Sequence, residues 1–538
     1  MSLFRAPIDD ILFALCAVAG ADQCEDWDGE LAREVIEAFA AFAEGELAPL
    51  NSLGDAQGCR VEDGRVLMPD GFREAYADLA GSGWQGMGIA EEFGGQGLPA
   101  YLQSAVSEIF SGANHSLQMV VNLVPGAAKV LGRFASTAMQ QHYIPRFANG
   151  DTLATMCITE PDAGSDLARI RCLARPDGDR WKITGEKIFI SGGDQNLSRE
   201  VLHLVLARTD DEGLRGLSLF GCSSLHKAGE RNRITVERIE AKMGLHASPT
   251  CQLRFDEADA QIIGRRGQGL ACMFAMMNHA RIDVALQGVA HAARAFDVAR
   301  SYAKERVQGS DANGNPVTID QHDDVARMLN EMAAGLFGGR AMAYRVLLLL
   351  ESDASPALLD FLTPIVKVFC SQLGTRVAEQ GQQVLGGYGY LSDYSLEQVY
   401  RDARITSIYE GTNGIHARGL LKRELPRKEG ADQFRDMLLA DVSQGESREA
   451  LRVSIAHWEE ACERLAVEGY PESEAADFMN LTARVFFLAQ WLQIIERLDA
   501  APNRKVYEAA GKYVLNRVPN EISFLAGVLG KSSAGMAA

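Results

Sequence analysis

One stretch of strand-like sequence, flanked on both sides by helical sequence, constrains the fold of this chain most. Between residues 151 and 270 the chain consists of short apolar runs separated by turn residues such as Pro176-Asp177-Gly178 and Thr184-Gly185. Short runs bounded by glycine, proline and aspartate are typical of hairpin strands. The segment therefore predicts a small all-β domain within a helical chain, an α+β architecture.

Helical spacing dominates the sequence on both sides of this segment. Apolar residues recur three and four positions apart between residues 1 and 150 and between residues 271 and 425, which is typical of amphipathic helices. Turns rich in glycine and proline interrupt them at residues 91–99 and 311–316. We expect a helical domain at 1–150, a middle β-barrel or sandwich at 151–270, and a helical bundle at 271–425. Two helices of that bundle are expected at 320–352 and 357–384.

The last part of the chain, residues 426–538, predicts an additional helical domain. Two apolar seams with helical steps lie here, formed by Leu451, Ile455, Trp458, Cys462 and Leu465 and by Phe478, Leu481, Val485, Leu488, Leu492 and Ile495. The polar stretch before them, residues 432–450, predicts a connector rather than a helix.

Composition excludes several classes of protein. The 538 residues carry a net charge of -19, so the basic surface of a nucleic-acid-binding protein is missing. The ten cysteines form no C-x-x-C pair or Cys/His cluster, and His115, His246 and His416 are isolated. We therefore expect neither a disulfide framework nor a metal site, and a reducing cytoplasm is the expected location.

The apolar run at residues 11–20 has some likeness to a signal peptide. Asp9 and Asp10 precede it, where the first region of a signal peptide is basic, so a short packed helix is the better interpretation. No apolar run reaches the roughly 20 residues that span a bilayer. We therefore expect no membrane insertion.

Two motifs of the β segment combine hydroxyls with small or aromatic residues. "MCITEPDAGSDLA" carries Thr159 and Ser165, and "KIFISGG" places Phe189 and Ser191 on one face of a strand. Such residues let a flat polar ligand approach closely. An ordinary turn and a core strand explain the same residues.

Two motifs in the helical segments also have both a structural and a ligand-binding interpretation. "QVLGGYGY", residues 383–390, is not G-x-G-x-x-G and does not follow a strand, so we exclude a Rossmann nucleotide site, and a helix C-cap explains it. "NHARID" places Asn278 and Arg281 on one helix face. They could bind the amide and phosphate of a ligand or form a solvated pair.

One isolated carboxylate, Glu410, lies among apolar and small residues in "ITSIYEGTNGIHARGLL", residues 405–421. An ion pair with Arg404 or Arg418 would explain it structurally. A general base would also explain it, since burial raises the pKa of a carboxyl group. The residues alone leave both interpretations open.

Taken together and in this order, six sequence words resemble one family, the flavin-dependent acyl-CoA dehydrogenases. The words are "EEFGGQGLP", "ITEPDAGSD", "KIFISGG", "AKERVQG", "QVLGGYGY" and "RDARITSIYEGTNGI", and the resemblance covers about residues 30–425. "FRAPIDDILFAL", "ISGGDQNL", "KMGLHASPT" and "MMNHAR" are similar to the long subgroup, which has an added C-terminal helical domain.

The resemblance implies a role for particular residues. Glu410 matches the catalytic base, and Ala280, the place of the base in some members, carries no carboxylate. The residues that match FAD contacts are Met156, Ile158, Thr159, Phe189, Ile190, Ser191, Arg306, Gln308, Gln383, Gly386, Gly387, Thr412 and Asn413. Those that match acyl-CoA contacts are Ser165, Asn278, Arg281, Tyr409 and Gly411.

The family further implies a reaction and a cofactor. FAD would take a hydride at N5 from the β-carbon of an acyl-CoA while Glu410 takes the α-proton, which gives a trans-2-enoyl-CoA. Similarity to the long subgroup implies 3-methylmercaptopropionyl-CoA, from dimethylsulfoniopropionate breakdown, as substrate. General short- to medium-chain acyl-CoAs, as in fatty acid β-oxidation, are the alternative.

The implied partners are the acyl-CoA substrate, an electron-transfer flavoprotein and further copies of the chain. A dimer or tetramer is expected because Arg306 and Gln308 match contacts to the FAD pyrophosphate of a neighbouring subunit. An acyl-CoA oxidase on the same fold, which reduces O2 instead, and a non-enzymatic acyl-CoA-binding scaffold are the rival interpretations.

Overall fold

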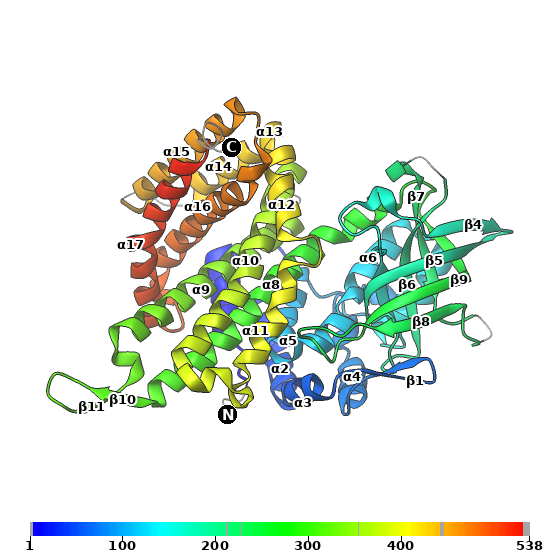
Figure 1. The fold of residues 1–538 in the computed structure, drawn as a ribbon, viewed down its shortest axis with the longest axis horizontal. Helices are drawn as coiled ribbons and strands as arrows, with labels where there is room; N and C mark the ends of the chain where they lie inside the picture. Colours follow the sequence, from blue (N-terminus) through cyan, green and yellow to red (C-terminus); the bar gives the residue numbers. More distant parts are fainter. Residues whose placement is uncertain (1–3, 211–212, 227–228, 353, 442–445, 531–538) are drawn as a thin grey trace, which may run out of the picture. The chain divides into compact units, whose positions relative to one another are not determined.

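The structure, a computed structural model, describes residues 4–210, 213–226, 229–352, 354–441 and 446–530 (Figure 1). The chain forms two compact units, one of residues 41–280 and one of residues 1–40 with 281–538. The boundaries fall inside helix α2 (Gly29–Phe42) and helix α8 (Gly269–Glu305). Each unit is described by itself below.

A seven-stranded sheet forms the centre of the unit at residues 41–280. Its strands run in the order β3-β6-β4-β5-β9-β7, with β8 beside β9, and β6 also pairs with β7. Five strands thus make a closed circuit, which removes exposed sheet edges. The strands are β3 (Thr152–Cys157), β4 (Leu173–Asp177), β5 (Arg180–Ser191), β6 (Glu200–Arg208), β7 (Leu217–Ser223), β8 (Ile234–Ile239) and β9 (Thr250–Ile263).

The interior of this barrel is apolar, as the alternating sequence requires. Ile183, Phe220 and Phe255 are completely or almost completely buried, together with Cys157 and Cys222. At about 25 cal/mol per Å² of buried apolar surface, such side chains each stabilise the fold by roughly 1.5–3 kcal/mol. The α+β class predicted from the sequence is therefore confirmed, with the sheet inside the segment predicted to be β.

Helices complete this unit. They are α3 (Pro49–Gln57), α4 (Phe72–Gly81), α5 (Ala100–Val121), α6 (Leu123–Phe134) and α7 (Thr137–Ala148), with a small hairpin of β1 (Arg60–Glu62) and β2 (Arg65–Leu67). Ser136 caps α7 by accepting a hydrogen bond from the Met139 N–H at 3.4 Å. Helix α6 packs against β3, so the sheet and the helices share one core.

Long antiparallel helices form the other unit. After residue 281 of α8 come α9 (Asp323–Glu351) and α10 (Pro356–Leu385), which pack on each other. The hairpin of β10 (Val307–Ser310) and β11 (Pro316–Thr318) lies between α8 and α9, and the short helices α11 (Leu396–Ala403), α12 (Asn413–Gly419) and α13 (Leu425–Arg427) follow α10. The two helices predicted from periodicity match α9 and α10 within three residues at each end.

The apolar run near the N-terminus packs inside this same unit. Helix α1 (Ile8–Leu12) continues into the π-helix η1 (Phe13–Ala19), and Ile11 and Leu15 are fully buried. The Tyr507 ring lies edge-on to the Phe13 ring, 5.2 Å between centroids, and its hydroxyl donates to Asp10 at 2.8 Å. The packed-helix interpretation of this run agrees with the structure.

Three helical segments are long and apolar enough to cross a membrane, contrary to the expectation that no run reaches that length. They are Asp323–Glu351, Pro356–Tyr390 and Glu472–Glu496, and their apolar windows are 78%, 78% and 83% buried inside the protein. A helix that is apolar all round is characteristic of the core of a large protein as well as of a membrane span. The expectation was wrong because these long apolar helices lie at the centre of a bundle, where protein covers their apolar side chains.

The C-terminal extension consists of helices α14 (Glu429–Asp441), α15 (Glu446–Val467), α16 (Ala475–Glu496) and α17 (Arg504–Val528). Figure 1 shows α15, α16 and α17 as one group, and α16 and α17 both contact α9. Most of the two predicted seams is buried. Trp491 of α16 donates its indole N–H to the Ala334 carbonyl at 2.9 Å, which joins the extension to the bundle.

The predicted polar connector was wrong at residues 432–441, which belong to helix α14, and at residues 446–450, which begin helix α15. Phe434 and Leu438, four residues apart, are fully buried, and the Phe434 ring lies 5.3 Å from the Phe361 ring and 5.5 Å from the Trp458 ring. This narrow stripe suffices to dock a helix whose other residues are polar. Residues 442–445 of the predicted connector lie outside the described residues.

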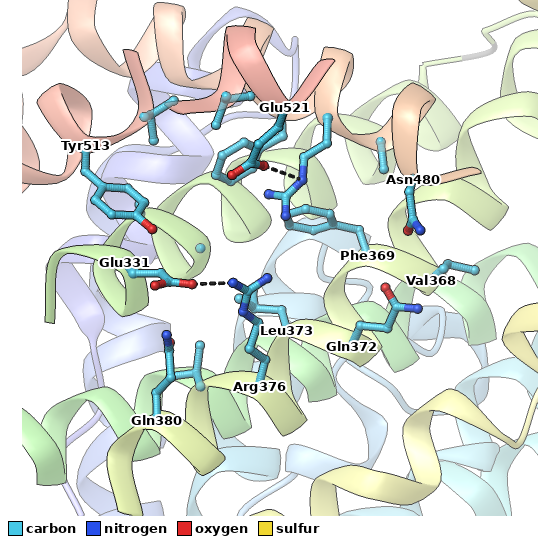
Figure 2. A pocket seen from close by; sticks show the side chains of 18 residues that line it. Glu331, Val368, Phe369, Gln372, Leu373, Arg376, Gln380, Asn480, Tyr513 and Glu521 are labelled. Carbon is cyan, nitrogen blue, oxygen red and sulfur yellow. Dashed lines mark hydrogen bonds and ion pairs between the residues drawn. The ribbon is translucent and has the colours of Figure 1, made fainter. Parts of the chain in front are cut away.

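A polar cavity of about 220 Å³ lies between α9, α10, α16 and α17 (Figure 2). Glu331 and Arg376 form an ion pair across it, and Glu521 pairs with Arg484 at 3.2 Å. One ion pair thus lies within the bundle and the other within the extension, and the cavity separates the two groups of helices here.

Candidate functional site

Glu410 lies in the turn between the 3-10 helix η11 (Arg404–Ser407) and helix α12. Its φ is 52° and that of Gly411 is 88°, so two consecutive residues adopt a left-handed backbone. This conformation costs a residue with a Cβ about 1–2 kcal/mol. Strain of this kind persists only where the surroundings hold it, and it concentrates at functional sites.

Two side chains hold the carbonyl groups of this turn. The Lys367 ammonium of α10 donates to the Gly411 carbonyl at 2.8 Å and to Asn413 Oδ1 at 3.0 Å. His416 Nε2 lies 2.9 Å from the Glu410 carbonyl oxygen. A Cβ at position 411 would lie only 2.8 Å from that same His416 nitrogen. Glycine at 411 is therefore required by both the backbone angle and the neighbouring ring.

The charges around Glu410 oppose one another. Burial raises the pKa of its carboxyl group, while the cations Arg281 and Lys367 lower it and the Asp283 carboxylate raises it. Burial lowers the pKa of Lys367 to about 7, although Glu410 opposes this change. Burial also lowers the pKa of His416 to about 3, so its ring is neutral and its Nε2 carries the proton that it donates.

The alternative interpretation of Glu410 as the partner of Arg418 does not match the contacts. Arg418 forms its ion pair with Glu472 at 3.1 Å, and Arg404 is exposed. The cations that act on Glu410 are the half-buried Arg281 and the buried Lys367 instead. Lys367 had no place in the sequence prediction, although a lone lysine within the apolar run "LTPIVKVFC" could have signalled it.

Tyr409 anchors the same turn to helix α8. Its hydroxyl donates to Gln287 Oε1, and the Gln287 amide donates to Asp283 at 2.7 Å. Burial raises the Tyr409 pKa well above its ordinary value, so the hydroxyl keeps its proton. The residue predicted to contact substrate thus also fixes the turn that carries Glu410.

Thr412 and Asn413, both predicted FAD contacts, begin helix α12. The Thr412 hydroxyl accepts from the Ile415 N–H at 3.3 Å and so caps the helix. The Asn413 amide donates to Ser371 Oγ at 3.2 Å while its oxygen binds Lys367. Both residues therefore belong to the network that surrounds Glu410.

The remaining predicted FAD contacts of this unit are exposed and lie elsewhere. Arg306 follows α8 with its guanidinium 5.7 Å from the centre of the Tyr388 ring, and the Gln308 carbonyl binds His322 at 2.7 Å. Gln383, Gly386 and Gly387 lie at the end of α10, roughly 24 Å along the helix from Lys367 at about 1.5 Å per residue. This arrangement does not bring these five residues to Glu410.

In the unit of residues 41–280, the predicted flavin contacts gather on β5 and on the segment after β3. Lys187 is fully buried and binds Glu160 at 2.8 Å, the Ile158 carbonyl at 2.8 Å and the Leu206 carbonyl at 2.7 Å. The Ile188 N–H donates to the Thr159 carbonyl at 2.9 Å. Met156, Ile158 and Thr159 are thereby placed beside residues 188–191.

Phe189 has the most unusual geometry of this group. The β5–β9 register shifts between Lys187 and Ile190, and Phe189 adopts a φ of 58° with 60% of its surface exposed. An aromatic residue with positive φ is a genuine outlier. Ile190 points into the barrel core, whereas Phe189 and Ser191 remain accessible.

These features fit a flavin. An exposed ring held in a strained conformation, with the hydroxyls of Thr159 and Ser191 on the adjoining segments, offers one face for stacking and polar groups for a ring system. Ordinary core packing does not account for a phenylalanine that is mostly exposed. Sequence reasoning missed Lys187 and Glu160, the buried pair that positions Thr159, because each looked like a common surface charge.

The predicted acyl-CoA contacts Ser165 and Asn278 lie on different segments of this unit. Ser165 is exposed in the loop after β3, and Asn278 is half-buried on the first part of α8. His279, beside Asn278, lies 2.9 Å from the Lys129 ammonium. Within residues 41–280, Ser165 and Asn278 thus stay predicted acyl-CoA contacts that come from two segments.

Comparison with known proteins gives a consistent result. Three family models match, the acyl-CoA dehydrogenase N-terminal domain at residues 29–151, its middle domain at 155–258 and its C-terminal domain at 267–425. The chain is 40% identical over 465 residues to 3-methylmercaptopropionyl-CoA dehydrogenase of Ruegeria pomeroyi, which covers 81% of this chain and 79% of that protein.

Two further proteins are similar over most of the chain. The broad-specificity linear acyl-CoA dehydrogenase FadE5 of Mycobacterium tuberculosis is 33% identical over 471 residues, 80% of this chain and 76% of that protein. A crystal structure of an acyl-CoA dehydrogenase from Bacillus anthracis, complexed with FAD, superposes with a TM-score of 0.77 at 20% identity. It covers 97% of this chain and 91% of that chain, so the fold extends through the C-terminal helices.

Proposed function

Because this chain belongs to the acyl-CoA dehydrogenase family, we propose that it oxidises 3-methylmercaptopropionyl-CoA to the corresponding trans-2-enoyl-CoA with Glu410 as the base. The family is FAD-dependent, and acyl-CoA dehydrogenase activity follows from membership. The observation that carries the role of Glu410 is its position. It is a carboxylate on a strained backbone whose carbonyls are held by Lys367 and His416, and the charges of Arg281 and Lys367 act on it.

Glu410 performs the proton step in this proposal. One carboxylate oxygen forms an O–H bond while the α C–H bond of the thioester breaks. Burial raises the pKa of the carboxyl group and so makes the carboxylate a stronger base, while Arg281 and Lys367 oppose that rise. The Glu410 N–H polarises the thioester carbonyl, which stabilises the negative charge that develops there.

The cofactor supplies the redox chemistry, since bound FAD accepts the hydride that leaves the β-carbon. Phe189, Ile190 and Ser191 of β5, with Met156, Ile158 and Thr159, would hold its ring. The exposed groups at the end of α10 and at Arg306 and Gln308 would hold its pyrophosphate and adenosine parts. Arginine suits the pyrophosphate because its guanidinium makes charge-assisted hydrogen bonds to phosphate oxygens.

The substrate assignment rests on similarity to the Ruegeria protein. A thioether sulfur is close in size to a methylene group, and one methylene changes binding by only about 1–3 kcal/mol. A general linear acyl-CoA dehydrogenase is therefore the second candidate, favoured by the similarity to the broad-specificity mycobacterial protein.

A panel of acyl-CoAs tests the assignment. We expect the highest kcat/KM for 3-methylmercaptopropionyl-CoA, with butyryl-CoA next and palmitoyl-CoA last, in an assay with an artificial electron acceptor. Equal efficiency on the thioether and on butyryl-CoA would favour the general enzyme. A clear preference for palmitoyl-CoA would reject both candidates.

An electron-transfer flavoprotein is the proposed electron acceptor, and the cytoplasm the proposed location. An oxidase on the same fold would pass electrons to O2. Reducing the enzyme anaerobically and mixing it with air or with the flavoprotein decides between them. Rapid reoxidation by air alone would identify an oxidase.

A further inference from the structure

Lys367 has an environment that ordinary packing does not require. It lies in the middle of α10 and is fully buried. Its ammonium donates to the Gly411 carbonyl and the Asn413 side-chain oxygen, and neither of these oxygens carries a charge. Removing an ammonium group from water is costly unless something in the protein uses its charge.

Glu410 is the carboxylate that acts on the charge of Lys367. Each group stabilises the charge of the other, since Lys367 lowers the pKa of Glu410 and Glu410 raises the pKa of Lys367. Burial acts in the opposite direction on both groups. The ammonium thus binds the turn through its hydrogen bonds and acts on the carboxylate through its charge.

We propose that Lys367 is a positioning residue for Glu410 with two separable roles: its hydrogen bonds hold the strained turn at 410–413, and its ammonium group, bound to the carbonyl of the residue after the base, brings a positive charge to the Glu410 carboxylate. The inference rests on the proposed role of Glu410 as base. It adds a residue whose effect is exerted through the base rather than on the substrate.

The other charges that face Glu410 come from the elements packed around it. Arg281 on α8 acts in the same direction as Lys367, and Asp283 on the same helix acts against both. His416 on α12 is neutral, because burial lowers its pKa to about 3. Loss of the Lys367 charge therefore leaves Arg281 to oppose burial and Asp283, and the pKa of Glu410 rises.

Three variants separate the two roles of Lys367. Lys367→Gln keeps a hydrogen-bond donor but removes the charge, and Lys367→Arg keeps a cation that does not titrate. Ser371→Ala is the uncharged control, because it removes a hydrogen bond to the same Asn413 side chain. Retained FAD and the far-ultraviolet circular dichroism spectrum report whether each variant is folded.

The measurement is a pH titration of the Glu410 carboxyl group by infrared difference spectroscopy on the FAD-loaded protein, with Glu410→Gln subtracted. We expect Lys367→Gln to raise the pKa of Glu410 by roughly one pH unit or more, and Lys367→Arg and Ser371→Ala to leave it at or below the wild-type value. The acid limb of flavin reduction by acyl-CoA should move by the same amount.

An unchanged pKa in Lys367→Gln, or an equal rise in Ser371→Ala, would overturn the proposal. If Lys367→Gln does not fold, Lys367→Arg decides alone, because a pKa of Glu410 above the wild-type value in that variant contradicts a role for the charge. Failure of the base assignment looks different, since Glu410→Gln would then reduce its flavin at a normal rate.

Discussion

Glu410 and Phe189 share a backbone conformation that residues with a Cβ rarely adopt, with φ values of 52° and 58°. One carries the proposed base and the other the exposed ring proposed to face the flavin. Each left-handed residue costs about 1–3 kcal/mol, and the contacts of Lys367, His416 and Lys187 offset that cost. At this scale, function depends on side chains that hold the backbone as much as on those that react.

The first residue-scale prediction concerns the base itself. Glu410→Gln should keep FAD bound but slow flavin reduction by acyl-CoA by about 10²–10⁴-fold, the usual contribution of a positioned general base. Anaerobic stopped-flow absorbance of the flavin measures it. Glu429→Gln, an exposed glutamate on α14, serves as control, and near-normal reduction in Glu410→Gln would refute the assignment.

The second residue-scale prediction concerns the glycine beside the base. Gly411→Ala should lower kcat at least about tenfold, because its φ of 88° is strained for alanine and the new Cβ would lie 2.8 Å from His416. The matched control is Gly419→Ala in α12, where the nearest atom would be 3.9 Å away. Equal kcat values for the two variants would contradict the described turn.

At the scale of elements, the predicted helices and strands follow from local periodicity. The apolar spacing over residues 320–352 and 357–384 located α9 and α10, and the alternating runs located the sheet. Helix α14 was missed because Phe434 and Leu438 are its only large side chains that are buried among the described residues, too few to stand out from polar sequence. The contact of Lys367 with Gly411 was missed because it joins residues 44 positions apart, which periodicity cannot reveal.

The element-scale prediction concerns the attachment of α16. Trp491→Ala should destabilise the protein by about 3–5 kcal/mol, because it leaves a cavity against Gly338 and removes the hydrogen bond to the Ala334 carbonyl. Trp491→Phe keeps most of the ring and should cost less. Urea unfolding of both variants measures the difference, and equal midpoints would show that packing of the ring contributes little to stability.

At the scale of the whole molecule, the sequence words identified the family and therefore the cofactor and the reaction class. The substrate depends on the shape of a pocket built by side chains from several helices, which no single motif encodes. The predicted FAD contacts illustrate the same limit, because Thr159, Gln383 and Arg306 lie in separate segments whose grouping only the family pattern indicated.

The whole-molecule prediction concerns assembly. The active protein should sediment as a dimer or larger, because Arg306 and Gln308 match contacts made to the FAD of a neighbouring subunit. Arg306→Ala should reduce FAD content at equilibrium dialysis by about tenfold, since the pyrophosphate loses a charge-assisted partner. Lys304→Ala, which changes an exposed cation two residues earlier at the end of α8, should retain FAD, and a fully active, FAD-saturated monomer would refute the prediction.

The hydrogen bond from Lys367 to the Gly411 carbonyl also indicates when this turn forms during folding. The strained turn gains that hydrogen bond only after the middle of α10 and the segment beyond residue 410, 44 positions apart at the contact, have come together. Contacts between distant residues form after local helices, because closing the loop costs chain entropy. The base should therefore acquire its final conformation among the last parts of this unit, and mild denaturant should abolish flavin reduction before it melts the helices.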